Sequence, residues 1–150
     1  MVSELIVQGR GPGGDGIAIR GTSGSRIDGN IIFDTVNAIG LLGTTSPNLN
    51  NVIRNNEIFS NRQGIVLQGS QNSNNVVMGN NVSSNIDDGI VIGQDNPNEI
   101  TDNVMLSNGR WDIRRLSGSQ NQLVINNNIC EVSEPFGNCP TTVPDFNIDH

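Results

Sequence analysis

The chain has 150 residues and a net charge of −7, and all eight of its basic residues are arginine. It shows no basic stripe, no apolar run long enough to span a bilayer and no positively charged leader. We therefore expect neither a nucleic-acid nor a membrane partner. The 24 asparagines and 18 glycines tolerate left-handed backbone, which predicts a chain that turns sharply and often.

One sequence phrase recurs along the chain in five copies. Each copy opens with a short apolar segment and continues through a polar stretch to a second apolar residue, which an Asn follows three places later. The opening segments are 16–19, 38–41, 64–67, 89–92 and a degraded copy at 112–113. The recurring asparagines, at intervals of 26, 24, 23 and 24 residues, are Asn30, Asn56, Asn80, Asn103 and Asn127. Such a period is typical of stacked repeats and predicts a solenoid.

Each copy holds three short apolar pieces with alternating placement and no helical stripe. Strands this short cannot stand alone, so neighbouring copies are expected to stack at the β spacing of about 4.8 Å. The recurring Asn is expected at the corner between the second and third strands. There it would take a left-handed conformation and form hydrogen bonds along a column of identical side chains. Asn72, in a turn, is expected at the surface.

These rungs resemble those of the pectate-lyase-like superfamily, in which an Asn ladder occupies the same turn. The resemblance covers roughly residues 14–132 and implies an all-β, right-handed parallel β-helix of about five rungs. It says little about activity, because this architecture hosts lyases, hydrolases, epimerases, tailspikes and adhesins. We expect residues 1–132 to form the solenoid, beginning with an incomplete rung, and residues 133–150 to form an irregular C-terminal cap.

The two ends of the chain carry expectations of their own. Cys130 and Cys139 are spaced for either a short-loop disulfide or two free thiols, and poorly for a metal. Residues 1–13 look like the remnant of an earlier rung without a capping helix. This predicts end-to-end association of copies through the N-terminal rung. A capped C-terminus beside an uncapped N-terminus suggests the C-terminal part of a larger protein. The chain is either intracellular or exported with its signal removed, and the direct entry into patterned sequence favours a secreted or cell-surface location.

Charged residues gather before the first strands of the last two copies. Asp88 and Asp112 are expected on adjacent rungs about 5 Å apart, which suits retaining glycoside chemistry or a shared Ca²⁺ ion. Arginine forks suit acidic sugars, and the resembled lyases often use a basic residue with bound Ca²⁺. Apart from calcium, no cofactor is expected. The candidate sets are Asp88, Asp112 and Arg114 for catalysis; Arg110, Arg115 and Asp87 for substrate binding; and Asp87, Asp88 and Asp112 for calcium.

The last copy is irregular in sequence. Aligning Ile113 with Ile65 places Arg115 at a core position, whereas aligning the two Gly-Ser-Gln-Asn runs places Leu116 there. Since both alignments cannot hold, a bulge is expected near Arg114 and Arg115.

Two functions from different classes fit this sequence. The first is a non-catalytic carbohydrate-associated or surface-display module. It is favoured because the outward face of the first strands is mostly apolar or small, and the turns before them are too short to wall a cleft. The second is a polysaccharide lyase, hydrolase or epimerase that acts on an acidic polysaccharide through the charged cluster. A polysaccharide is the expected partner in the second case and a natural one in the first.

Overall fold

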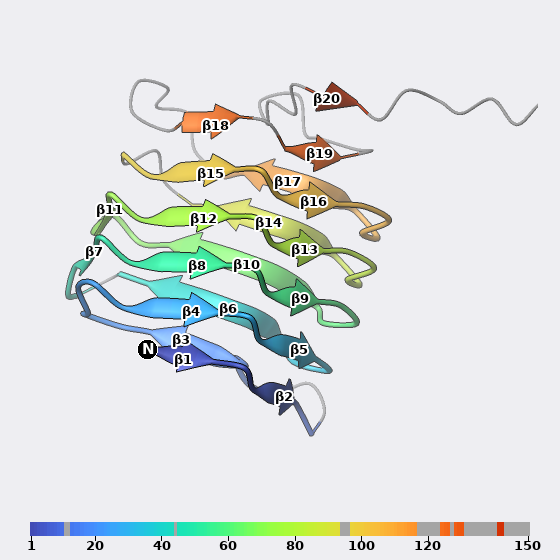
Figure 1. Ribbon diagram of the computed structural model, residues 1–150, viewed down its shortest axis with the longest axis horizontal. Coiled ribbons are helices and arrows are strands. Elements are labelled where there is room, and N and C mark those ends of the chain that lie inside the picture. Colours follow the sequence, from blue (N-terminus) through green and yellow to red (C-terminus); the bar gives the residue numbers. More distant parts are fainter. Residues whose placement is uncertain are drawn as a thin grey trace, which may run out of the picture.

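The structure is a computed structural model. It describes residues 1–10, 13–43, 45–93, 97–116, 124–126, 128–130 and 141–142, without the side chains of 124–126 and 141–142. Over these residues the secondary structure is entirely β, in twenty short strands (Figure 1). No helix of the length and hydropathy needed to cross a bilayer occurs in the part of the chain that is described.

Eighteen of the strands form three sheets that run along the molecule. The six-stranded sheet contains β1 (Val2–Ser3), β4 (Arg26–Asp28), β8 (Val52–Arg54), β12 (Val76–Met78), β15 (Glu99–Thr101) and β18 (Val124–Asn126). The five-stranded sheet contains β3 (Ile17–Ile19), β6 (Asn37–Leu42), β10 (Gln63–Gln68), β14 (Asp88–Ile92) and β17 (Trp111–Arg115). The seven-stranded sheet contains β2 (Ile6–Gln8), β5 (Ile31–Phe33), β9 (Glu57–Ile58), β13 (Asn81–Val82), β16 (Val104–Met105), β19 (Ile129–Cys130) and β20 (Thr141–Thr142). The remaining two, β7 (Asn48–Leu49) and β11 (Asn72–Ser73), pair with each other.

The connectivity confirms a parallel β-helix. From β1 to β19, consecutive strands of the chain belong to different sheets, and within each sheet these strands pair in parallel with the strand about one repeat away. Ile53, for example, is in register with Ile27 on one side and Val77 on the other. Residues 1–13 do begin with an earlier rung, because β1 and β2 pair with β4 and β5. Most of the expected cap at 133–150 lies outside the described residues, but β20 extends the seven-stranded sheet beside β19.

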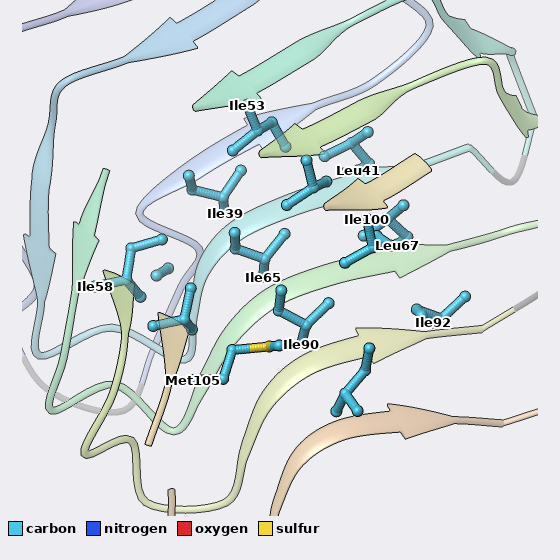
Figure 2. Packing of buried hydrophobic residues seen from close by; sticks show 14 of the residues in the cluster. Ile39, Leu41, Ile53, Ile58, Ile65, Leu67, Ile90, Ile92, Ile100 and Met105 are labelled. Carbon is cyan, nitrogen blue, oxygen red and sulfur yellow. The ribbon is translucent and has the colours of Figure 1, made fainter. Parts of the chain in front are cut away.

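The core is a stack of aliphatic side chains enclosed by the three sheets (Figure 2). Ile39, Ile65 and Ile90 are consecutive in register, and each is 0% exposed. Because alternate residues of a strand point to opposite faces, the repeated Ile-x-Ile or Ile-x-Leu pattern directs both apolar residues inward. Burying one such side chain contributes about 1.5–3 kcal/mol. Aliphatic stacking therefore holds together a chain with few aromatic residues.

Asparagine columns line the corners of the solenoid. In each column, the side-chain oxygen of one Asn accepts hydrogen bonds from the backbone N–H and the side-chain amide of the Asn one rung earlier. Asn56 thus donates to Asn80 Oδ1 through its backbone N at 3.0 Å and through Nδ2 at 2.9 Å. The three longest columns contain Asn30, Asn56, Asn80, Asn103 and Asn128; Asn51, Asn75 and Asn98; and Asn61, Asn85 and Asn108.

The stacked asparagines correct three details of the sequence interpretation. In the first column, one of these is the identity of the last member. The fifth member is Asn128 and not Asn127, since Asn103 Nδ2 donates to Asn128 Oδ1 at 2.9 Å; Asn127 lies outside the described residues. The left-handed conformation belongs to the residue before each of the first four asparagines of this column: Gly29, Asn55, Gly79 and Asp102 have φ of 69°, 54°, 62° and 55°. Asn72 is 2% exposed and not at the surface, because its amide bonds to Asn48 and to backbone carbonyls.

Candidate functional site

Asp88 and Arg114 form an ion pair beside the five-stranded sheet. Asp88 opens β14, and its Oδ2 accepts hydrogen bonds from Arg114 Nη1 at 3.1 Å and Gln63 Nε2 at 3.3 Å. The Asp88 side chain is 0% exposed, and that of Arg114 is 23% exposed. Asp88 Oδ1 and Arg114 Nε are both buried without a hydrogen-bond partner. The structure thus brings together two of the predicted catalytic residues, but it encloses the carboxylate.

Asp112 does not stand opposite Asp88. Asp88 and Asp112 lie on adjacent rungs, as expected, but the register pairs Asp88 with Trp111, so the two aspartates are one residue out of register. Asp112 is 1% exposed, and its Oδ1 accepts hydrogen bonds from Asn108 at the backbone N (3.3 Å) and at Nδ2 (2.6 Å). In an earlier rung, the equivalent two bonds run from Asn61 to Asn85 Oδ1, on the following rung. Asp112 therefore ends the column of Asn61, Asn85 and Asn108.

Two of the candidate substrate-binding residues lie on adjacent rungs, since the backbone N of Arg110 donates to Asp87 O at 2.8 Å, and the third, Arg115, lies in a different environment. Asp87 is partly exposed and its Oδ2 pairs with Arg62 Nε at 3.0 Å, while Arg110 is exposed on the next rung. Arg115 is half-buried and in register with Ile92. The register is continuous from Ile113 to Arg115, so the bulge expected here is not found in β17. Among the described residues, no three His, Cys, Asp or Glu side chains gather as a metal site.

A groove of about 670 Å³ follows the turns that lead from the seven-stranded to the five-stranded sheet. The short turns had predicted no cleft, but consecutive rungs together form one. Its walls include the exposed apolar side chain of Ile86 and the Arg62–Asp87 ion pair. Of the predicted site residues, Asp87 lines it. The full lining is Gly9, Asp34, Thr35, Val36, Ser60, Arg62, Ile86 and Asp87.

The outward face of the first strands carries two buried valines at its centre. Val66 and Val91 point away from the core but are 4% and 2% exposed. They are in register with each other on β10 and β14. A polymer laid along this face would therefore meet a closed surface at these two residues.

Residues 4–142 match the protein family described as periplasmic copper-binding protein NosD. The chain belongs to the NosD family. No curated protein and no solved structure matches it. The periplasmic description of NosD agrees with the expected location outside the cytoplasm. So does the chemistry of Cys130, which is buried and disulfide-bonded, since disulfides persist in oxidising compartments such as the periplasm. Cys139, the other cysteine of the sequence, lies outside the described residues.

Proposed function

We propose that this NosD-family chain is a non-catalytic, carbohydrate-associated β-helix module of an exported protein. The observation that carries the proposal is the state of the two candidate catalytic carboxylates. Asp88 and Asp112 are both buried, and each is engaged in bonds that hold neighbouring rungs or turns together. Glycoside hydrolysis in most enzyme families needs two carboxyl groups that flank the scissile bond, and a Ca²⁺-dependent lyase needs carboxylates that are free to bind the ion. The carboxylates of Asp88 and Asp112 instead form hydrogen bonds within the solenoid.

The groove at the turns is the place where we propose that sugar binds. Its volume of about 670 Å³ is within the range of ligand sites, which combine apolar walls with a few polar groups. Val36 and Ile86 supply apolar surface, and Arg62 and Asp87 supply a donor and an acceptor at the rim. Because the turns repeat along the axis, the groove suits an extended chain better than a compact molecule.

A binding panel with matched variants tests this proposal. Ile86 is 68% exposed, so Ile86→Asn should leave stability unchanged while weakening glycan binding in isothermal titration calorimetry. Leu116→Asn is the control, since Leu116 is 50% exposed and does not line the groove. Binding of no glycan, or equal weakening in both variants, would count against the proposed site.

The family description also raises copper as a ligand, but the donors that the structure describes do not fit it. Copper sites use thiolate, thioether or imidazole ligands. Cys130 is disulfide-bonded, Met105 is 0% exposed in the core, and His150 lies outside the described residues. The other two methionines are far apart, because Met1 precedes β1 and Met78 ends β12, three strands away in the six-stranded sheet. Over the described ranges no cluster of His, Cys, Asp or Glu is found. We therefore derive no copper chemistry for this chain. Stoichiometric Cu²⁺ binding at micromolar affinity would contradict that reading.

A further inference from the structure

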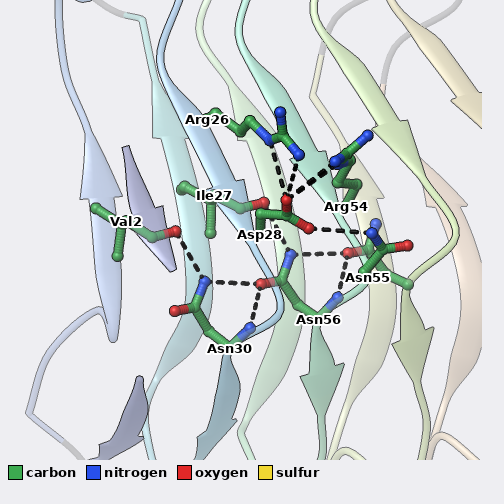
Figure 3. Close-up of polar contacts among 9 residues, drawn as sticks. Val2, Arg26, Ile27, Asp28, Asn30, Arg54, Asn55 and Asn56 are labelled. Atoms are coloured by element: carbon green, nitrogen blue, oxygen red, sulfur yellow. Dashed lines mark hydrogen bonds and ion pairs between the residues drawn. The ribbon is translucent and has the colours of Figure 1, made fainter. Parts of the chain in front are cut away.

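Two arginines and one aspartate form a cluster on the outer face of the six-stranded sheet (Figure 3). Arg26 and Asp28 lie on β4, and Arg54 lies on β8 in register with Asp28. Asp28 Oδ2 accepts from Nε and Nη2 of Arg26 at 3.0 and 2.5 Å, and from the same atoms of Arg54 at 3.2 and 3.1 Å. Asp28 Oδ1 accepts from Asn55 Nδ2 at 3.0 Å. One carboxylate thus fixes the orientation of both guanidinium groups.

The cluster carries more positive than negative charge. The other described ion pairs each join one arginine to one aspartate: Arg20 to Asp15, Arg62 to Asp87 and Arg114 to Asp88. Here two guanidinium groups share one carboxylate, on a chain whose net charge is −7. The excess charge faces solvent, since the Arg26 and Arg54 side chains are 41% and 36% exposed while that of Asp28 is 15% exposed.

Both arginines keep donors for a ligand. A guanidinium has five N–H groups, and the bonds to Asp28 use Nε and Nη2 of each side chain. The Nη1 groups therefore remain to donate to an incoming anion. Because Asp28 already orders both side chains, an anion that binds them loses little further side-chain entropy. Carboxylates are well matched to such planar forks.

Apolar side chains border the cluster on the same face. The register places Val52 beside Arg26 and Met78 beside Arg54, and both apolar side chains are half-buried. A sugar ring can lay its C–H surface on such residues while a carboxylate on the ring reaches the guanidinium groups. We propose that this face binds uronate groups of an acidic polysaccharide, with Arg26 and Arg54 as binding residues and Asp28 as their positioning residue. This inference rests on the proposed carbohydrate-associated function. It adds that the ligand is acidic and that it contacts a second surface besides the groove.

Isothermal titration calorimetry of the whole chain tests the proposal with three probes: polygalacturonate, free galacturonate and the neutral polymer dextran. Arg54→Gln is expected to weaken polygalacturonate binding on the order of tenfold or more, because it removes charge-assisted hydrogen bonds. Arg54→Lys keeps the charge but loses the planar fork, so it should also weaken binding. Arg20→Gln is the control: it removes the same charge from a side chain that is 67% exposed and paired with a single aspartate. Thermal unfolding measures whether each variant is folded.

The outcomes separate this inference from the function on which it rests. Polygalacturonate binding that falls with Arg54→Gln and Arg54→Lys, but not with Arg20→Gln, supports the site. Unchanged binding in the Arg54 variants, an equal fall in Arg20→Gln, or equal affinity for free galacturonate and the polymer would overturn it. In those cases dextran binding that depends on Ile86 would leave the carbohydrate-associated function in place. Binding of none of the three probes would remove both.

Discussion

Replacing Asn80 by alanine is expected to lower the free energy of unfolding by about 3 kcal/mol. Asn80 lies in the middle of its column and is 1% exposed. Its Oδ1 accepts from the backbone N and Nδ2 of Asn56 at 3.0 and 2.9 Å, and its Nδ2 donates to Asn103 Oδ1 at 2.9 Å and Ile53 O at 3.1 Å. Alanine removes these bonds and leaves the backbone N–H of Asn56 buried without its acceptor. An orphaned buried group costs about 1–3 kcal/mol, and each further lost bond about 1 kcal/mol before relaxation.

Thermal unfolding followed by circular dichroism measures this loss. For a domain of this size, about 3 kcal/mol corresponds to a fall in Tm of roughly 6–12 °C. Asn81→Ala is the control, because Asn81 is the next residue along the chain but is exposed and accepts only a short-range bond from Ser83 Oγ in the described structure. It should change stability by about 0.5 kcal/mol or less. Equal losses at Asn80 and Asn81 would refute the reasoning that the column stabilises the stack.

Three further predictions concern the stack and its end. Gly64→Ala should destabilise the protein by about 1–3 kcal/mol in urea unfolding, because an added Cβ would overlap Val82 Cγ1 and the backbone oxygen of Gly89. Gly14→Ala is the control and should be close to neutral, since its added Cβ meets open space; equal effects of the two changes would contradict the packing argument. Asp112→Ala should lower the free energy of unfolding by about 2 kcal/mol. Asp112→Asn should retain most of the stability, because its amide oxygen can still accept hydrogen bonds from Asn108. An equal fall in Tm for both variants would argue that Asp112 does not end the column. Light scattering should show concentration-dependent association through the edges of β1 and β2, where Leu5 and Ile6 are 49% and 72% exposed. Ile6→Lys should reduce this association, and a strictly monomeric parent chain at high concentration would contradict the prediction.

The repeat made most of the fold predictable. A side-chain period of two fixes which residues of a short strand face inward, so residues such as Ile65 and Leu67 could be assigned to the core without a structure. The position of the last column Asn could not be fixed in this way, because Asn126, Asn127 and Asn128 are consecutive and only the register distinguishes them. The left-handed residue was also misplaced. The corner needs both a positive φ and a buried amide, and two successive residues divide these roles.

The candidate site was less predictable, because it depends on burial. The repeat spacing puts Asp88 and Arg114 on adjacent rungs, and the ion pair is present. The sequence could not show that the carboxylate is buried. The groove was missed because residues from several separate turns form it. The cluster around Asp28 could have been predicted from the sequence. Arg26 and Asp28 share the outward face of one strand, and Arg54 follows Asp28 at the repeat interval of 26 residues.

We propose that this chain binds carbohydrate without cleaving it. The most direct test incubates the whole chain with polygalacturonate, with and without Ca²⁺, and follows unsaturated product by ultraviolet absorbance and new reducing ends by a colorimetric assay. Binding is measured in parallel by calorimetry. We expect binding with no product under either condition. Product that increases with protein concentration and is lost in Asp88→Asn would contradict it, and would make the buried Asp88–Arg114 pair a catalytic site.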